Sequence, residues 1–397
     1  MNIIENFSIE EKFVINLVKN ECIKQGVKVY IVGGAVRDGL LGKKVNDIDI
    51  CVTTNPINII NNMKYIKKYK YHENFQTSTI IFNNGITIDL IRCRKECYDF
   101  DGALPNVIPS DIYADLYRRD FTINAVAYDL IDKKIIDFFN GVEDIKLKRI
   151  RKVHGNSYCE DPTRIFRGVR YAVRYEFNLY DKSEIEDTVF NGMIHRISED
   201  RIMREIYLMC MEEEWIKNIT YCNELKIMNT EDKLLGKKNQ FCDYYYINNR
   251  ILNLFLALND EQFIKIFINN SVLEKQLRKS LKDYIDSKAV VESILVNTVS
   301  NFEIYRVFKN FSLDEIKMFS FNKLFKYKII NYLKNMKGTV LAVNGHDLFS
   351  LGIQQGEDVG KIINYLKQIK IDTLLSIEKY YLKRNLGEIL NGIEHKN

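Results

Sequence analysis

The sequence predicts a small mixed α/β domain at the N-terminus, followed by a remainder built only of helices. Strand-like apolar runs and a hairpin turn signal at Asn83-Asn84-Gly85 fall within the first 147 residues. After about residue 148 these signals fade, and helical periodicities take over at 161–175, 199–212 and 358–370. A chain of 397 residues also exceeds the usual size of a single core. We expect domains at 1–147, 148–212, 213–305 and 306–397, with the later boundaries placed on polar, loop-like stretches.

The elements of the α/β domain follow from the spacing of apolar residues. Residues 8–25 are expected to form an amphipathic helix, with Phe13, Val14, Leu17 and Val18 on one face. Strands are expected at 28–33 and 47–52. Two hairpins complete a small mixed sheet, one joining 77–82 to 86–92 and one joining 123–130 to 134–139 around Asp132-Lys133. This domain ends near Gly141.

Residues 29–52, VYIVGGAVRDGLLGKKVNDIDICV, carry the most informative pattern of the chain. In a strand, residues i and i+2 point to the same face, so Asp47 and Asp49 would direct two carboxylates the same way and bury Ile48 between them. Mg²⁺ usually takes one or two carboxylates plus substrate phosphates. The backbone N–H groups of Gly33 and Gly34 offer an anion nest beside it. The pattern therefore predicts a site for Mg²⁺ and a triphosphate.

Other interpretations of this stretch are weaker. An Asp-x-Asp pair alone is more often a solvated strand end or a helix cap, but here a Gly-Gly turn lies upstream, and Arg37 lies on the helix between. No G-x-x-x-x-G-K-[ST] sequence occurs, and the glycines do not fit G-x-G-x-x-G, which excludes a Walker loop and a Rossmann fingerprint.

Two further motifs add polar groups to the same sheet. Asp89 lies on the second strand of the 77–92 hairpin and is either a third carboxylate of the site or a charge on the strand face. The run DLYRRDFTINAVAYD, residues 115–129, places Arg118, Arg119 and Asp120 before an apolar strand. Arginine offers forked donors to phosphate oxygens, and Asp120 can accept from a sugar hydroxyl. An isolated Arg-Arg-Asp is more often a surface ion-pair cluster, but its place at the mouth of this sheet favours the site.

The helix that begins at EDPTR, residues 160–164, is predicted to read a base. Asp161 and Arg164 are i,i+3 neighbours on one face. CTP and ATP each present an amino donor beside a ring-nitrogen acceptor, which would match a carboxylate and a guanidinium in that order. UTP and GTP present the reverse order. The alternative is a salt bridge on the helix surface. Arg167 and Arg170, further along the helix, either contact phosphates or are solvated.

Composition excludes several other classes of protein. The net charge of +5 permits nucleic-acid binding without proving it. The eight cysteines form no C-x-x-C pair, so we expect neither a zinc site nor a disulfide framework. The N-terminus does not resemble a signal peptide, and no apolar run approaches the ~20 residues of a membrane helix. We therefore expect a soluble, cytoplasmic protein. His346-Asp347 is expected to be a turn or helix start, because the companion ligands of a metal-dependent phosphohydrolase are missing.

GGAVRD with DID, RRDFTINA, the EDPTR helix and ISEDRI (197–202) together resemble the class II tRNA nucleotidyltransferase/poly(A) polymerase family. The segment 341–366 is also similar to the bacterial CCA-adding branch. The resemblance implies a nucleotidyltransferase head with a polymerase-β-like mixed sheet, followed by all-helical neck, body and tail domains. It implies that Asp47 and Asp49 bind catalytic Mg²⁺, with Asp89 at the third acidic position. It also implies that Arg119, Asp120 and Asn124 contact the nucleotide.

The function implied is addition of CCA to the 3′ end of tRNA from CTP and ATP, with no membrane and no obligate protein partner. A CC-adding enzyme, an A-adding enzyme and a poly(A) polymerase are the nearest alternatives, and a catalytically inactive RNA-binding module is an alternative of another class. In this family a flexible loop is linked to addition of the final A, and the 25 residues from Cys93 to Tyr117 leave room for it. The basic excess after residue 320, 12 Lys or Arg against 7 acidic residues, is compatible with a surface that contacts tRNA phosphates.

Overall fold

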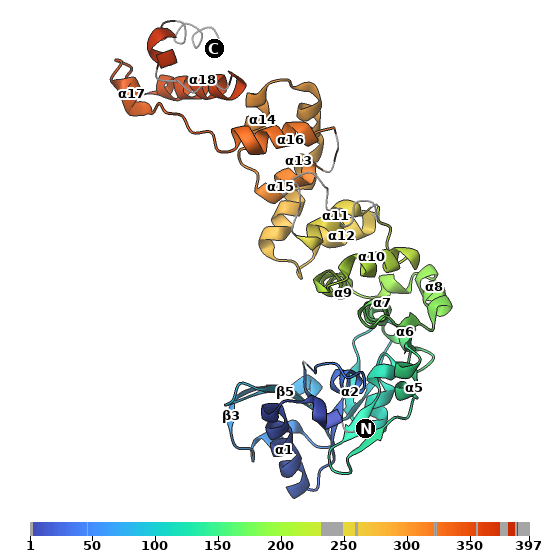
Figure 1. Ribbon diagram of the computed structural model, residues 1–397. Coiled ribbons are helices and arrows are strands. Elements are labelled where there is room, and N and C mark those ends of the chain that lie inside the picture. Colours follow the sequence, from blue (N-terminus) through green and yellow to red (C-terminus); the bar gives the residue numbers. More distant parts are fainter. Residues whose placement is uncertain are drawn as a thin grey trace. The chain divides into compact units, whose positions relative to one another are not determined.

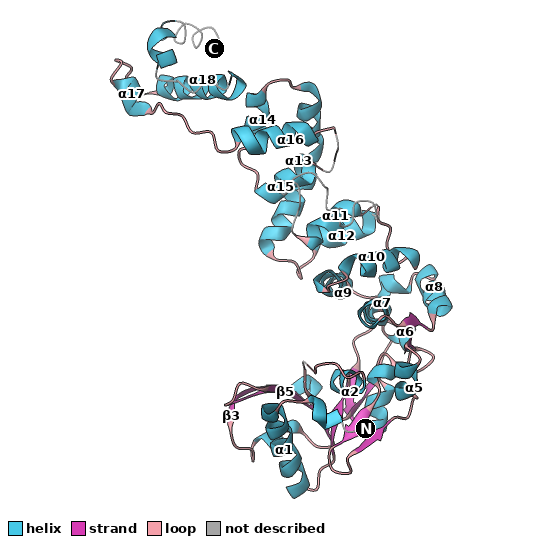
Figure 2. Ribbon diagram, viewed as in Figure 1, coloured by secondary structure: helices cyan, strands magenta, loops and turns pink. Residues whose placement is uncertain are grey.

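The computed structural model describes residues 3–45, 47–231, 249–258, 261–320, 322, 324–354, 356–373, 380–385 and 387. The chain divides into two compact units, residues 1–230 and 231–397 (Figure 1). All strands of the described residues lie in the first unit, and Figure 2 draws these strands in magenta. The expectation of an α/β head followed by helices is therefore confirmed.

A seven-stranded mixed sheet forms the centre of the first unit, in the order β3-β4-β5-β2-β1-β8-β9. The strands are β1 (Val29–Val32), β2 (Asp49–Val52), β3 (Ile66–His72), β4 (Thr77–Phe82), β5 (Thr87–Arg92), β8 (Ala127–Asp129) and β9 (Lys134–Ile136). The pairing of β2 with β5 is parallel, and the other pairings are antiparallel. A separate hairpin pairs β6 (Arg94–Cys97) with β7 (Asn106–Pro109), and β10 (Arg149–Ile150) pairs with β11 (Asn178–Leu179).

One face of this sheet carries the main apolar core. The helices α1 (Ile9–Lys24), α2 (Gly34–Leu40) and α3 (Pro56–Ile60) pack there with alternate residues of the strands, such as Ile50, Ile80 and Leu90. The helix expected at 8–25 is thus confirmed, and it begins at a capping box in which Ser8 accepts from the backbone N–H of Glu11. A smaller core under β1, β2 and β8 includes residues of α4 (Ile112–Tyr117).

The hairpin predicted at 77–92 is confirmed as β4 and β5, and the second hairpin is confirmed as β8 and β9. Two details differ from expectation. The strand predicted from residue 47 begins at Asp49, and residues 122–124 form a short 3₁₀ turn and not the start of a strand. Strand β3 was not predicted, because its sequence IKKYKYH lacks the alternation of a half-buried strand.

Helices complete the first unit after the sheet. They are α5 (Gly141–Lys146), α6 (Ser157–Glu160), α7 (Thr163–Tyr175), α8 (Lys182–Phe190), α9 (Glu199–Met211) and α10 (Trp215–Glu224). The helices predicted at 161–175 and 199–212 correspond to α7 and α9. Helix α7 packs against both α9 and α10, and also against the β10 and β11 strands.

The second unit is helical in the part that the structure describes. Its elements are α11 (Arg250–Ala257), α12 (Glu261–Asn269), α13 (Lys275–Asn297), α14 (Asn301–Phe308), α15 (Leu313–Phe319), α16 (Lys326–Asn331), α17 (Gly345–Phe349) and α18 (Glu357–Thr373). His346-Asp347 starts α17, where Asp347 and Asn344 form a capping box, so the predicted helix start is confirmed. No helix among the described residues is long and apolar enough to cross a membrane.

Candidate active site

The Gly33-Gly34 turn connects β1 to α2 and brings backbone close to charged side chains. Gly33 adopts φ 68°, a conformation that favours glycine. A Cβ at this position would lie 2.7 Å from Nη1 of Arg119 and 3.6 Å from Oδ2 of Asp49. A side chain here would therefore displace the guanidinium that lies beside the carboxylate.

Two carboxylates meet where β2 and β5 run side by side. Asp49 is directly opposite Asp89 in the parallel register, and Oδ1 of Asp89 accepts from the hydroxyl of Thr79 at 2.6 Å. Asp47 lies two residues before the first residue of β2, but it lines the same cavity as Asp49, and Ile48 is buried as predicted. Burial raises the pKa of Asp49 to about 6, and the charges of Asp89 and Asp47 act in the same direction against that of Arg119. A bound cation would relieve this accumulation of negative charge.

A cavity of about 510 Å³ opens beside these carboxylates. It brings together the predicted residues Gly33, Gly34, Arg37, Asp47, Asp49, Arg118, Arg119, Asp120, Asn124, Asp161, Arg164 and Arg167. Asp89 and Arg170 are the predicted site residues that do not line it. The lining also includes Asp38, Ile91, Glu96, Tyr98, Pro105, Tyr171 and Arg174.

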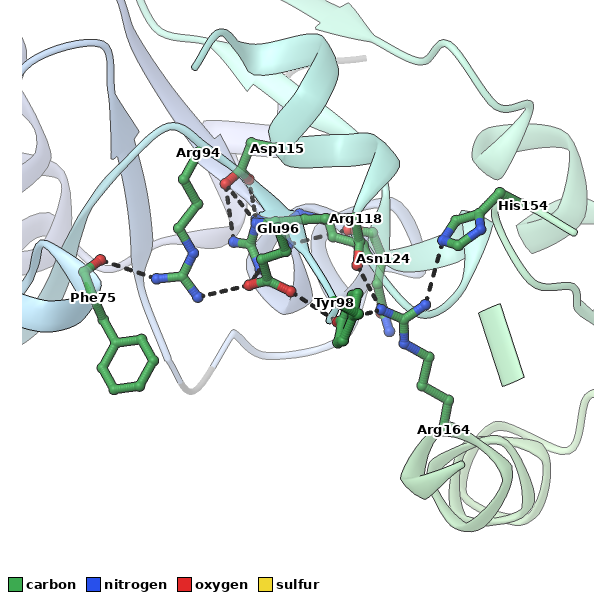
Figure 3. A network of polar contacts seen from close by, with 10 residues as sticks. Phe75, Arg94, Glu96, Tyr98, Asp115, Arg118, Asn124, His154 and Arg164 are labelled. Atoms are coloured by element: carbon green, nitrogen blue, oxygen red, sulfur yellow. Dashed lines mark hydrogen bonds and ion pairs between the residues drawn. The ribbon is translucent and has the colours of Figure 1, made fainter. Parts of the chain in front are cut away.

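The two arginines of the Arg-Arg-Asp motif are held by a buried carboxylate that the sequence interpretation missed. Asp115 on α4 accepts from Arg118 at 2.9 Å (Figure 3). It also accepts from Arg119 at 3.0 Å. Burial opposes the charge on Asp115, but Arg118 and Arg119 outweigh it and lower its pKa. Arg118 also pairs with Glu96 at 2.9 Å. Arg118 is therefore largely satisfied within the protein, and Arg119 is the member of the pair that lies against Gly33 and Asp49.

Asp120 is buried, with each of its oxygens already bonded. Oδ1 accepts from the side-chain amide of Asn124 at 2.9 Å, and Oδ2 accepts from Nε of Arg167 at 2.8 Å. Burial would raise the pKa of Asp120, but Arg167 and the hydrogen bonds outweigh it and lower the pKa to about 2. Asn124 also accepts from Nη1 of Arg37 at 2.5 Å. These bonds join α2, the segment 118–124 and α7 into one wall of the cavity.

Asp161 and Arg164 stand at the start of α7 with only part of their bonding capacity used. Oδ1 of Asp161 accepts from the backbone N–H of Thr163 at 3.0 Å and from Arg201 at 2.7 Å, while no hydrogen bond from a described residue reaches Oδ2. Arg164 is buried, and its two terminal nitrogens donate to the hydroxyl of Ser157 at 2.7 Å and to the carbonyl of Arg118 at 2.9 Å. The pair is thus fixed in place and still offers an acceptor.

Arg170 requires a correction to the predicted set. It is 6% exposed and forms a 3.1 Å ion pair with Glu205 of α9. Because it points into the contact between α7 and α9 and does not line the cavity, we expect a structural role for it. Arg201 and Tyr98 were missed as partners of the base-reading pair, since Arg201 binds Asp161 and Tyr98 accepts from Arg164 at 3.3 Å. The signal for Arg201 was its place in the ISEDRI motif.

The acidic side chains of the cavity are oxygen donors of the kind that Mg²⁺ prefers. No group of three His, Cys, Asp or Glu side chains forms a complete metal site within the described ranges. Mg²⁺ in phosphoryl-transfer sites takes one or two carboxylates and completes its shell with phosphates and water. Asp47 and Asp49 line the same cavity, and burial, with the charges of Asp89 and Asp47 acting in the same direction, raises the pKa of Asp49. The residues present therefore fit such an ion.

This mixed sheet, with carboxylates at the start of β2 and a Gly-Gly turn after β1, defines a nucleotidyltransferase head followed by helical domains. Residues 29–151 match the family model of the poly A polymerase head domain. The chain is 30% identical to an A-adding tRNA nucleotidyltransferase of Geobacter sulfurreducens, over 85% of this chain and 42% of that protein. It is 25% identical to a CCA-adding enzyme of Lactococcus lactis, over 91% of this chain and 93% of that protein.

Solved structures give the same result. The Thermotoga maritima CCA-adding enzyme complexed with tRNA superposes with a TM-score of 0.72 at 25% identity, covering 98% of this chain and 97% of that one. A CCA-adding enzyme in complex with ATP gives the same TM-score. The chain spans about half the length of the A-adding relatives that it matches. These comparisons confirm the resemblance to the tRNA nucleotidyltransferase and poly(A) polymerase family.

Proposed function

We propose that this protein adds the CCA sequence to the 3′ end of tRNA, using CTP and ATP and releasing pyrophosphate. The observation that carries the proposal is that one cavity contains both the Asp47/Asp49 carboxylates and the Asp161/Arg164 pair. A nucleoside triphosphate bound there would place its phosphates at one group and its base at the other. CCA-adding enzymes also match this chain over nine-tenths or more of both lengths.

In the proposed reaction the 3′-hydroxyl oxygen of tRNA forms a bond to the α-phosphorus of the nucleotide. The bond from that phosphorus to the bridging oxygen breaks, pyrophosphate leaves, and the hydroxyl proton passes to solvent or to a nearby carboxylate. Asp47 and Asp49 would hold Mg²⁺, which supplies positive charge where negative charge develops. Arg119, fixed by Asp115 against Gly33, adds a second positive group on the same side.

The base would be selected by the protein and not by a nucleic-acid template. Oδ2 of Asp161 would accept from the amino group of cytosine or adenine, and Arg164 would donate to the neighbouring ring nitrogen. Both bases present that order of groups, so one pocket serves two substrates. Arg201 and Ser157 hold the two side chains in place, so the protein provides the pattern before the nucleotide arrives.

Addition of the final A alone is the second candidate, because relatives that are 30–31% identical are A-adding enzymes. Segment 93–117, which forms β6, β7 and α4, supplies the loop region linked to A addition in this family and so favours full CCA addition over CC addition. Full CCA addition is favoured over A addition alone because the chain covers 93% of a CCA-adding enzyme but only 42–50% of these A-adding relatives. We further propose Asp89 as the third catalytic carboxylate, and head, neck, body and tail divisions at 1–147, 148–212, 213–305 and 306–397 with a tRNA-binding tail. The cytoplasmic location stays a prediction.

The deciding experiment uses tRNA transcripts ending at the discriminator base, or after one or two cytidines, each incubated with CTP, ATP or both. Full CCA addition predicts two added nucleotides with CTP alone and three with both on the shortest transcript, read on a sequencing gel. An A-adding enzyme would extend only the transcript that ends in two cytidines. Absence of any extension on all three would overturn the proposed function.

A further inference from the structure

The sheet of the first unit has one face that remains open over β5, β4 and β3. The core-facing residues of these strands, such as Ile80, Ile88 and Leu90, are fully buried under the helices. Side chains alternate along a strand, so the residues between them point to the opposite face. There Thr87 and Asp89 are exposed, while Thr79 and Ile81 are half-exposed.

The strand register links this open face to the catalytic carboxylates. Asp49 is opposite Asp89, Asp89 is opposite Thr79, and Thr79 is opposite Lys70. In the neighbouring row Thr87 is opposite Ile81, and Ile81 is opposite Lys68. Directly opposite residues share a face. Both lysines therefore lie on the face of the carboxylates, at the free edge of the sheet.

The lysines are exposed, and neither forms an ion pair with a residue that the structure describes. Between residues 64 and 92 the chain has five Lys or Arg against two acidic residues, one of which is Asp89 itself. Thr79 lies between Lys70 and Asp89, while Ile81 lies between Lys68 and Thr87. These two rows therefore carry positive charge at the sheet edge and no acidic side chain before Asp89.

The nucleotide cavity reaches this face only at Ile91, near the end of β5. The rest of its lining comes from the turn after β1, from Asp47 and Asp49, from the segments 96–105 and 118–124 and from the region of α7, and it does not include Asp89, Lys68 or Lys70. In phosphoryl transfer the attacking and leaving oxygens are roughly in line with the phosphorus. If pyrophosphate leaves toward Gly33 and Gly34, the attacking hydroxyl must approach from the side of Asp89, which is the side of the open face.

We propose that the 3′ strand of the RNA substrate lies across this open face and that Lys68 and Lys70 contact its phosphates. The inference rests on the proposed function. Strands are about 4.8 Å apart, so β3 lies about 14 Å from β2. Stacked nucleotides repeat at about 3.4 Å per phosphate, so the contacts fall about four nucleotides from the reacting end. That is the length of the CCA tail plus the discriminator base.

A different role is known for lysines on edge strands, which prevent one sheet from pairing with another. The two roles make different predictions. Preventing edge-to-edge pairing depends on repulsion between protein molecules, so loss of the lysines would then cause aggregation or dimerisation. Contacting RNA depends on phosphate charge, and its loss shows in the affinity for tRNA and in its dependence on salt.

The test is the double variant Lys68→Gln/Lys70→Gln, with Lys24→Gln/Lys134→Gln as the matched control. The control removes the same charge from α1, on the opposite face, and from β9, at the other edge of the sheet. We expect the first variant to raise KM for tRNA several-fold with KM for CTP unchanged. The slope of log Kd against log salt should fall by about 1.4 to 1.8, since each lost phosphate contact contributes about 0.7–0.9. The control should match wild type.

A second measurement locates the contact on the RNA. A methylphosphonate placed about four nucleotides from the 3′ end removes one phosphate charge. It should weaken binding to wild type, and should have little further effect on the double variant, because coupled groups are not additive. Unchanged KM and salt slope in the variant, or independent effects of the two changes, would overturn the inference, as would aggregation as the only effect. If wild type extends no tRNA at all, the proposed function has failed instead.

Discussion

The replacement Asp161→Asn tests the base-reading proposal most directly. Oδ1 of Asp161 is bonded to Thr163 and Arg201, and no described residue bonds Oδ2. An asparagine would keep its carbonyl oxygen on those donors and turn its NH₂ toward the base. The acceptor that matches an amino group would become a donor that matches the carbonyl of uracil or guanine.

The expected size of the effect follows from the number of contacts changed. A good bidentate base contact discriminates by about 1–3 kcal/mol, or roughly 10- to 100-fold. We therefore expect the preference for CTP over UTP to fall at least tenfold, with UTP incorporation rising in absolute terms. The side chains of Arg201 and Asp161 are 23% and 21% exposed. If Asp161 formed only a salt bridge with Arg201, loss of that bridge would cost at most ~1 kcal/mol of stability and would leave nucleotide selectivity unchanged.

The assay is single-nucleotide incorporation into tRNA ending at the discriminator base, with kcat/KM measured for each of the four triphosphates. Asp187→Asn is the matched control, because it makes the same change on the exposed surface of α8. A CTP:UTP ratio equal to that of wild type, in a variant that still folds and turns over, would refute the base-reading role. Asp161→Ala should lose selectivity without gaining UTP incorporation.

Asp49→Asn should abolish nucleotide addition with little loss of tRNA affinity, since it would remove a proposed ligand of Mg²⁺; substantial turnover with Mg²⁺ would contradict the assignment. Because the pKa of Asp49 is raised to about 6, protons compete with the metal below that pH, so a plot of kcat/KM against pH at limiting Mg²⁺ should fall as pH decreases through about 6. Arg170→Gln should leave KM for CTP unchanged but destabilise the fold by about 3–5 kcal/mol in urea unfolding, because it leaves the buried Glu205 without its partner. Asp120 has a pKa lowered from 3.8 to about 2. It therefore contributes about 2 kcal/mol of stability above pH 4, which is lost as pH falls toward 2. Asp120→Asn should remove most of the stability that wild type loses between pH 4 and pH 2. An acid-unfolding profile equal to that of wild type would exclude this contribution of Asp120.

The sequence predicted the elements whose patterns are local. The amphipathic helix at 8–25, the Asn-Gly hairpin and the long helices were placed within a few residues, because each depends on spacing along the chain. Strand β3 was missed because an edge strand with lysines on its open side buries few residues and shows no alternation. Its place beside β4 is decided by the sheet and not by its own composition.

For the site, the residue types were informative and their partners were not. The patterns identified Asp47, Asp49 and the Asp161/Arg164 pair as candidates that line one cavity. They did not reveal that Asp115 clamps the two arginines after it, since any Asp three or four residues before an Arg has the same spacing. The sequence interpretation left Arg170 either contacting phosphate or solvated. It could not identify the partner Glu205, because that residue is 35 positions away in the chain.

The parallel pairing of β2 with β5 also has a consequence for how the protein folds. Asp49 and Asp89 are 40 positions apart, and they become neighbours only after β3, β4 and β5 have formed a meander that docks against β2. Closing such a connection costs chain entropy before any stabilising contact forms, so we expect parallel pairings to form late. Helices such as α13 depend on local contacts and should form earlier. On refolding from urea, the helical signal in far-ultraviolet circular dichroism should therefore return before nucleotide addition does. Recovery of the proposed activity would therefore follow the long-range pairings of the sheet, among which β1 with β8 joins residues still further apart in the chain than β2 with β5.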